Sequence, residues 1–228
     1  MKIVISIGGS ILAPDGADYE YIKKFSSLIR ELIKNNENKI AIVVGGGKVA
    51  RNYITASRKL GASEFFSDLI GINATHLNAR VLIASLSDIS NLEPCLTILD
   101  AGRELKNNNV VIMGGTHPGH TTDGVSAMLY EYIKADLFVI ATSTDYVYTK
   151  DPRKYHDAEK LEKLSYDDLI KISGQVEMGA GSSTVVDLVA ANIIKRSKIK
   201  TIVLHAADLA NLKSALAGKK FTGSVIGE

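Results

Sequence analysis

Short apolar runs alternate with longer amphipathic segments along almost the whole chain. Runs rich in isoleucine and valine predict buried strands at residues 2–7, 41–44, 95–99, 110–113, 137–141 and 201–204, with an edge strand at 224–226. Apolar residues at helical spacing predict helices at about 18–34, 48–60, 64–86, 101–107, 122–134, 166–172, 184–195 and 209–216. This alternation predicts an α/β protein, a three-layer αβα sandwich with a largely parallel central sheet.

Glycine-bearing turns follow three of the predicted strands. These turns lie at residues 8–9, 45–47 and 114–115, and a polar loop follows another strand at 142–151. Because the carboxyl ends of parallel strands share one edge of a sheet, these segments are expected to converge. Glycine leaves backbone N–H groups open to a ligand, and a helix start attracts negative charge. Lys48 and Arg51 add cations beside the triple glycine, so this edge is predicted to bind several phosphate groups.

The triple glycine at 45–47 also allows other interpretations. A Walker A loop requires a glycine where Ile42 stands and a serine or threonine where Val49 stands, so that motif does not fit. A dinucleotide-binding fingerprint fits the glycine spacing, with Asp68 about 20 residues further on. In that fold, however, the acid ends a strand, whereas Asp68 begins a predicted helix. A glycine turn that binds no ligand is the third possibility.

Composition and charge narrow the class of protein. The 228 residues are 46% hydrophobic and 23% charged, which is typical of a soluble globular protein with one large domain or two closely joined lobes. The net charge of +2 comes from scattered lysines, so no nucleic-acid surface is expected. The single Cys95 suggests a reducing compartment, and the apolar run before Gly8 is too short for a signal peptide or a membrane span. We therefore expect a cytoplasmic protein without a membrane partner.

Several motifs follow one another in a characteristic order. They lie at residues 7–10, 45–51, 68–72, 114–122, 142–152 and 180–183, and the sequence GGTHPGHTT at 114–122 is the most specific of them. Together they span nearly the whole chain and resemble the amino acid kinase superfamily and, within it, uridylate kinases of the archaeal type. The resemblance implies an amino acid kinase-like fold with a single domain over residues 1–228. About 1–136 would form the acceptor-nucleotide lobe and about 137–228 the ATP lobe.

The resemblance also implies an activity, the transfer of the γ-phosphoryl group of ATP to UMP, which gives UDP and ADP in pyrimidine nucleotide biosynthesis. The residues implied in UMP binding are Gly46, Asp68, Thr116, His117, Pro118, Gly119, His120, Thr121 and Thr122. The residues implied in ATP binding are Gly8, Gly9, Ser10, Gly47, Arg51, Thr142, Tyr148 and Asp151. Mg²⁺ would arrive with ATP and bridge its phosphates without a dedicated protein site. Relatives of this type assemble as hexamers, so a homo-oligomer is expected by analogy.

Two positions depart from the pattern of the superfamily. Many bacterial relatives carry a catalytic lysine in the first strand where this chain has Ser6. We hypothesise that Lys48 supplies the missing cation, and Asp145 is a second candidate catalytic residue. Tyr146 stands where the usual motif has glycine, so it would be strained if that turn required a positive φ.

Other functions are compatible with the same motifs. The nearest is a kinase of this fold that acts on another small phosphate or carboxylate, such as isopentenyl phosphate. A non-catalytic protein that binds a nucleotide or oxoanion is the alternative from another class, because the first-strand lysine is missing. His117 and His120 resemble a metal-binding pair, but a Pro-Gly turn separates them, so they are expected to shape a pocket and no metal site is predicted.

Overall fold

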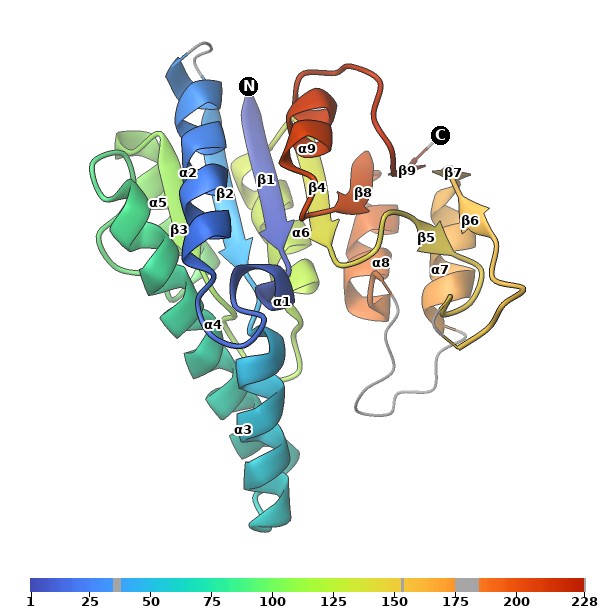
Figure 1. The fold of residues 1–228 in the computed structure, drawn as a ribbon, viewed down its shortest axis with the longest axis horizontal. Coiled ribbons are helices and arrows are strands. Elements are labelled where there is room, and N and C mark those ends of the chain that lie inside the picture. The colour runs from blue at the N-terminus through green and yellow to red at the C-terminus, as the bar shows by residue number, and fades with distance from the viewer. Residues whose placement is uncertain (35–37, 153, 175–184, 228) are drawn as a thin grey trace.

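The computed structural model describes residues 1–34, 38–152, 154–174 and 185–227, arranged around a seven-stranded sheet (Figure 1). The sheet has the order β3-β2-β1-β4-β8-β9-β7. Its strands are β1 (Lys2–Ile7), β2 (Lys39–Val44), β3 (Val110–Met113), β4 (Leu137–Thr142), β7 (Lys163–Leu164), β8 (Thr201–His205) and β9 (Ser224–Ile226). A separate antiparallel ribbon consists of β5 (Val147–Tyr148) and β6 (Lys160–Leu161).

The sheet is largely parallel, as the strand–helix alternation predicts. The strands from β3 to β8 pair in parallel, whereas β8 and β9 pair antiparallel. Alternate residues of each strand enter different cores: Ile3 and Ile5 of β1 lie in one, and Val4 lies in the other. Both faces of the sheet are therefore buried, which explains why its strands are continuous apolar runs.

Helices cover both faces of the sheet (Figure 1). The core on one face includes α2 (Tyr19–Lys34), α4 (Glu64–Leu86) and α9 (Leu209–Leu216). The other core includes α5 (Ile98–Asn107), α6 (Thr122–Ile133), α7 (Tyr166–Gly174) and α8 (Leu188–Arg196). Two further helices, α1 (Gly9–Leu12) and α3 (Gly47–Lys59), begin where β1 and β2 end. The predicted three-layer αβα sandwich is confirmed.

The strand predicted at 95–99 is wrong. Cys95 forms only an isolated bridge to Met113, and α5 already begins at Ile98. The preceding loop runs beside β3 and bonds to it through a side chain: Asn91 accepts a hydrogen bond from Ile112 N (2.7 Å) and donates one to Ile112 O (2.8 Å). The segment therefore follows the sheet closely enough to be apolar without adding a regular strand.

Two other boundaries differ from the sequence prediction. The strand at 224–226 is not at the edge, because β7 pairs with its outer side. A two-residue strand such as β7 is too short to give a hydrophobic pattern. The helix predicted at 184–195 begins at Leu188, because the Asp187 side chain caps it there. The motif at 180–183 lies outside the described residues.

Among the described residues, α4 is long and apolar enough to span a membrane by length and composition. A buried core helix of a folded domain passes the same test. In this structure α4 contributes Ala79, Leu82, Ile83 and Leu86 to the core on one face of the sheet. Its apolar character is thus accounted for by packing inside the fold.

Candidate functional site

The glycine turns after β1 and β2 are in direct backbone contact. Gly8 N donates to Ala141 O, and Gly45 N donates to Ile7 O, both at 2.9 Å. A Cβ atom on Gly9 would lie 2.2 Å from Gly45 O and 2.4 Å from Gly47 N. Only glycine fits this contact, so the two turns are held together at the carboxyl edge of the sheet.

The helix that follows the second turn starts without a side-chain cap. The N-cap of α3 is Gly46, which has no side-chain oxygen, and the first turn carries Lys48 and no acidic residue. Gly47 adopts a φ of 63°, where a larger residue would be strained. The free N–H groups and the helix dipole therefore favour an anionic ligand at this point.

The third glycine-bearing loop, residues 114–121, is anchored on α4. Gly115 N donates to Thr75 Oγ1 (2.7 Å), and His76 Nε2 is hydrogen-bonded to Gly115 O (2.8 Å). Gly119 N donates to Asp68 Oδ2 (2.8 Å). The structure therefore brings Asp68, a residue singled out from the sequence, together with the GGTHPGHTT loop, whereas the anchoring roles of Thr75 and His76 were not foreseen.

Helix α4 also fixes the triple glycine. The buried Asn78 donates from Nδ2 to Gly45 O (2.9 Å) and to Gly46 O (3.3 Å). A Cβ atom on Gly46 would lie 3.4 Å from Thr75 Cγ2, so Thr75 lies next to both glycine segments. Asn78 thus hydrogen-bonds to the carbonyl oxygens of the glycine turn, whereas the backbone N–H groups of the turn stay available to a ligand. A buried asparagine within a helical pattern was the only sequence signal for this role.

The two cations predicted near the triple glycine lie on α3. Both Lys48 and Arg51 are exposed. Lys48 Nζ forms an ion pair with the carboxylate of Asp15, in the loop that follows α1. The pair is exposed, so it contributes little to stability. The Lys48 ammonium group thus lies beside the paired glycine turns, and its partner Asp15 is exposed.

The polar loop after β4 forms a separate part of the same edge. Thr142 ends β4 next to Gly8, whose added Cβ would lie 3.8 Å from Thr142 Cα. Further along, Tyr148 Oη donates to Asp145 Oδ1 (2.8 Å), and Val147 N donates to Ser224 Oγ (2.8 Å). Thr142 therefore lies between the first glycine turn and the end of β8, where Ala206 N donates to Thr142 O (2.7 Å). Residues 147–148 instead contact β6 and β9.

Tyr146 is not strained. Among the described residues, the non-glycine positions with positive φ are Lys134 and Lys198. The buried Tyr146 ring contacts the Tyr148 ring edge-on at 6.4 Å, and Lys160 Nζ lies 4.9 Å from its centroid. Strain at Tyr146 was predicted only if the turn required a positive φ, and the loop takes a shape without one at this position.

A carboxylate that sequence reasoning missed lies beneath the first glycine turn. Ser6, only 2% exposed, donates from Oγ to Asp123 Oδ1 at 2.5 Å. The pKa of Asp123 is raised to about 7, mainly by burial; the Ser6 hydrogen bond lowers this pKa and the nearby Asp187 carboxylate raises it, both to a smaller extent. Ser6 is the position at which a lysine stands in many bacterial relatives. A serine inside an apolar strand was the signal that a polar partner existed.

The raised pKa of Asp123 predicts a pH-dependent stability. The folded protein holds this proton more tightly than the unfolded chain, so the stabilisation is complete below pH about 4 and is lost as the pH rises through about 7. Asp123→Asn keeps an oxygen for Ser6 but carries no charge. We expect its free energy of unfolding to rise relative to that of the wild type between pH 4 and 8, by up to about 4 kcal/mol.

Urea unfolding at several pH values measures this difference. Asp88→Asn is a suitable control, because the Arg30 guanidinium lowers the pKa of the exposed Asp88 carboxyl and no gain with pH is expected. Parallel stability–pH curves for wild type and Asp123→Asn from pH 5 to 8 would show that the carboxyl is not held protonated.

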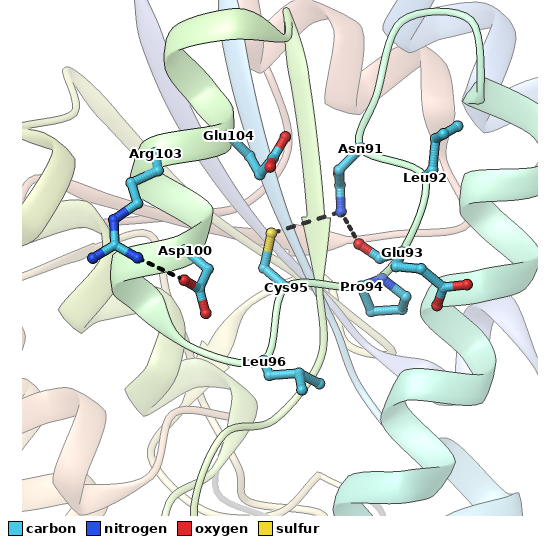
Figure 2. Close-up of a pocket in the computed structure, with 9 residues that line it drawn as sticks. All are labelled: Asn91, Leu92, Glu93, Pro94, Cys95, Leu96, Asp100, Arg103 and Glu104. Carbon is cyan, nitrogen blue, oxygen red and sulfur yellow. Dashed lines mark hydrogen bonds and ion pairs between the residues drawn. The ribbon is translucent and has the colours of Figure 1, made fainter.

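A cavity of about 500 Å³ lies away from these segments, between the loop beside β3 and α5 (Figure 2). It is lined by Asn91, Leu92, Glu93, Pro94, Cys95, Leu96, Asp100, Arg103 and Glu104. Arg103 is paired with Asp100 (3.1 Å), and Asn91 is bonded to backbone groups. Burial raises the pKa of Cys95 to about 12, so its thiol is a poor nucleophile. The cavity shares no residue with the predicted site.

Within the parts of the chain that the structure describes, no group of three or more His, Cys, Asp or Glu side chains is placed to hold a metal ion. His117 and His120 lie in one turn, with His120 N donating to His117 O at 3.3 Å. Both side chains belong to exposed residues at the rim of the site.

Paired glycine turns, an uncapped helix start and an anchored loop at one edge of a parallel sheet define a protein that binds anionic groups. A model of the "Amino acid kinase family" matches residues 1–205, so the chain belongs to the amino acid kinase family. This confirms the resemblance seen in the ordered motifs.

Individual relatives agree with this assignment. The chain is 46% identical over 219 residues to the uridylate kinase of Pyrococcus abyssi, covering 96% of each chain. It is 48% identical over 205 residues to that of Methanocaldococcus jannaschii, covering 90% of each. The crystal structure of the uridylate kinase from Archaeoglobus fulgidus matches with a TM-score of 0.87 and 43% identity over 99% of this chain and 100% of that chain.

Proposed function

We propose that the chain is a nucleoside monophosphate kinase that transfers the γ-phosphoryl group of ATP to UMP, giving UDP and ADP. The observation that carries this proposal is the GGTHPGHTT loop, which α4 anchors beside the paired glycine turns. The family, and relatives with 42–49% identity that are uridylate kinases, support it. Such a reaction needs positioning and charge stabilisation more than covalent attack, and this edge of the sheet provides both.

On the acceptor side, Gly46 would contact the phosphate of UMP at the start of α3. Asp68 would accept the ribose hydroxyls next to the loop that its Oδ2 atom already holds through Gly119 N. The loop at 116–122 would surround uracil and ribose. A nucleotide placed this way would direct its phosphate toward the uncapped amides of α3.

On the donor side, the contact between the two glycine turns sets the geometry. Residues that would bind the ATP phosphates are Gly8, Gly9, Ser10, Gly47 and Arg51; those that would bind adenosine are Thr142, Tyr148 and Asp151. Because Gly9 and Gly47 touch, phosphates bound at the two turns would be close enough for direct transfer. The attacking phosphate oxygen of UMP is already ionised, so no general base is required.

Charge stabilisation would come from Lys48 together with Mg²⁺ carried by ATP. Mg²⁺ would neutralise phosphate charge and is usually held by phosphate oxygens and water with few protein ligands. Asp145 accepts a hydrogen bond from the Tyr148 hydroxyl and would orient the Tyr148 side chain at the adenosine pocket.

We further propose how the chain is divided into lobes and that it forms an oligomer. Residues of about 1–136 would form the acceptor lobe and about 137–228 the ATP lobe of one cytoplasmic domain. The arm formed by α3 and α4 extends beyond the sheet (Figure 1), and Tyr53, Leu60 and Phe65 on it are exposed. Exposed apolar side chains of this kind favour association, which supports a homo-oligomer, a hexamer by analogy with the family.

A coupled assay of ADP release tests the function. We expect turnover with UMP that exceeds turnover with CMP, AMP and isopentenyl phosphate. If only isopentenyl phosphate were phosphorylated, the proposed acceptor UMP would be wrong and the chain would be a kinase of another small phosphate. A tightly bound nucleotide without turnover would instead indicate the non-catalytic binding protein.

A further inference from the structure

One hydrogen bond joins the end of the acceptor loop to a helix in the proposed ATP lobe. Thr121 Oγ1 donates to Asp187 Oδ2. Thr121 is the N-cap of α6, where its Oγ1 also accepts from Gly124 N (3.1 Å). Asp187 is the N-cap of α8. The contact thus connects two helix caps that are 66 residues apart in the chain.

Asp187 uses its two carboxylate oxygens for different purposes. Oδ1 accepts from Val189 N (2.8 Å) and Ala190 N (3.1 Å), which satisfies the start of α8. Oδ2 is the atom that reaches Thr121. Since capping requires only one oxygen, a serine would cap α8 equally well. The second oxygen therefore serves the acceptor loop.

The packing behind this contact fixes its position. Helices α6 and α8 lie against each other, and a Cβ atom on Gly124 would be 3.5 Å from Val189 Cγ1. This packing sets the position of the two helix starts relative to each other and places the Asp187 carboxylate next to Thr121.

We propose that Asp187 is a positioning residue that holds the acceptor loop from the donor half of the protein. This inference rests on the proposed function. Asp68, Thr75 and His76 hold the loop from α4, and Asp187 holds its far end from α8. Anchored on both sides, the loop keeps the acceptor phosphate in register with the donor phosphates and loses little conformational entropy when UMP binds.

The substitution that isolates this role is Asp187→Ser. Serine preserves the cap of α8 but is too short to reach Thr121. We expect KM for UMP to rise about tenfold, as for the loss of a hydrogen bond to a charged group, with KM for ATP within twofold of the wild-type value. Asp187→Asn retains both length and cap and can donate to Thr121, so its KM for UMP should lie between those of the other two proteins.

The control is the same substitution at another cap. Asp208 caps α9 through Asn211 N (2.9 Å), so Asp208→Ser should leave KM for UMP at the wild-type value. Steady-state rates with UMP and ATP varied in turn, together with thermal unfolding, distinguish positioning from folding. Unchanged KM for UMP in Asp187→Ser, or an equal rise for both substrates with a lower Tm, would overturn the proposal.

Amide hydrogen exchange of the peptide covering 114–124, without any nucleotide, provides a readout independent of activity. Exchange should be faster in Asp187→Ser than in wild type and unchanged in Asp208→Ser. Equal exchange in all three proteins would contradict the anchoring role. If wild type failed to phosphorylate UMP while the exchange difference was present, the proposed function would be wrong and the anchor would stand.

Discussion

Gly9→Ala is expected to destabilise the protein by about 3 kcal/mol or more and to abolish phosphoryl transfer. The new methyl group would lie 2.2 Å from Gly45 O and 2.4 Å from Gly47 N, and both neighbours are backbone atoms that cannot rotate away. The turns after β1 and β2 would have to separate, which would displace both sets of phosphate-binding amides. Denaturant unfolding and ADP release measure the two effects.

The adjacent glycine provides the comparison. A Cβ atom on Gly8 would be 3.6 Å from its nearest neighbour, Ala141 O, and its φ of −61° suits alanine. We therefore expect Gly8→Ala to fold with a stability close to that of the wild type. Equal losses of stability in both variants would mean that the contact between the turns is not what requires glycine at position 9.

Lys48→Ala is expected to lower kcat about 100-fold, which corresponds to about 3 kcal/mol of lost transition-state stabilisation. The Lys48 ammonium is exposed and pairs with the exposed Asp15 carboxylate, so a bound phosphate can recruit it at little energetic cost. Single-turnover measurements with ATP and UMP separate this effect from substrate binding. An unchanged kcat in Lys48→Ala would show that Lys48 is not a catalytic residue.

Two further variants refine this test. Asp15→Asn removes the partner of Lys48 but keeps the cation, so kcat should stay near the wild-type value. Lys48→Arg keeps the charge and should recover part of the activity lost in Lys48→Ala. A decrease in Asp15→Asn as large as that in Lys48→Ala would show that the ion pair itself matters.

Local patterns predicted most of the fold. Strands such as β1 and β2 bury both faces and are therefore continuous runs of isoleucine and valine, which are easy to recognise. Helices with one apolar face, such as α2 and α5, were recognised for a similar reason. The short strands of the carboxyl-terminal half, such as β7, were missed because two residues carry no periodicity.

The candidate site was only partly predictable, because its decisive contacts join distant segments. The glycine turns were expected to share an edge, but their direct contact through Gly9 depends on how β1 and β2 pair. Likewise, nothing local to Asn78, Asp123 or Asp187 indicates its partner. Polar residues in apolar patterns marked such positions without identifying what they contact.

The loop beside β3 has a consequence for the behaviour of the protein at high concentration. An unprotected outermost strand offers a template on which another polypeptide can add, which leads to aggregation. Here the side chain of Asn91 occupies both Ile112 N and Ile112 O, and Ile89 O accepts from Val110 N. The Asn91 side chain and the backbone of the same loop thus take the place of an eighth strand and cover hydrogen-bonding groups of β3 that would otherwise be open to another polypeptide.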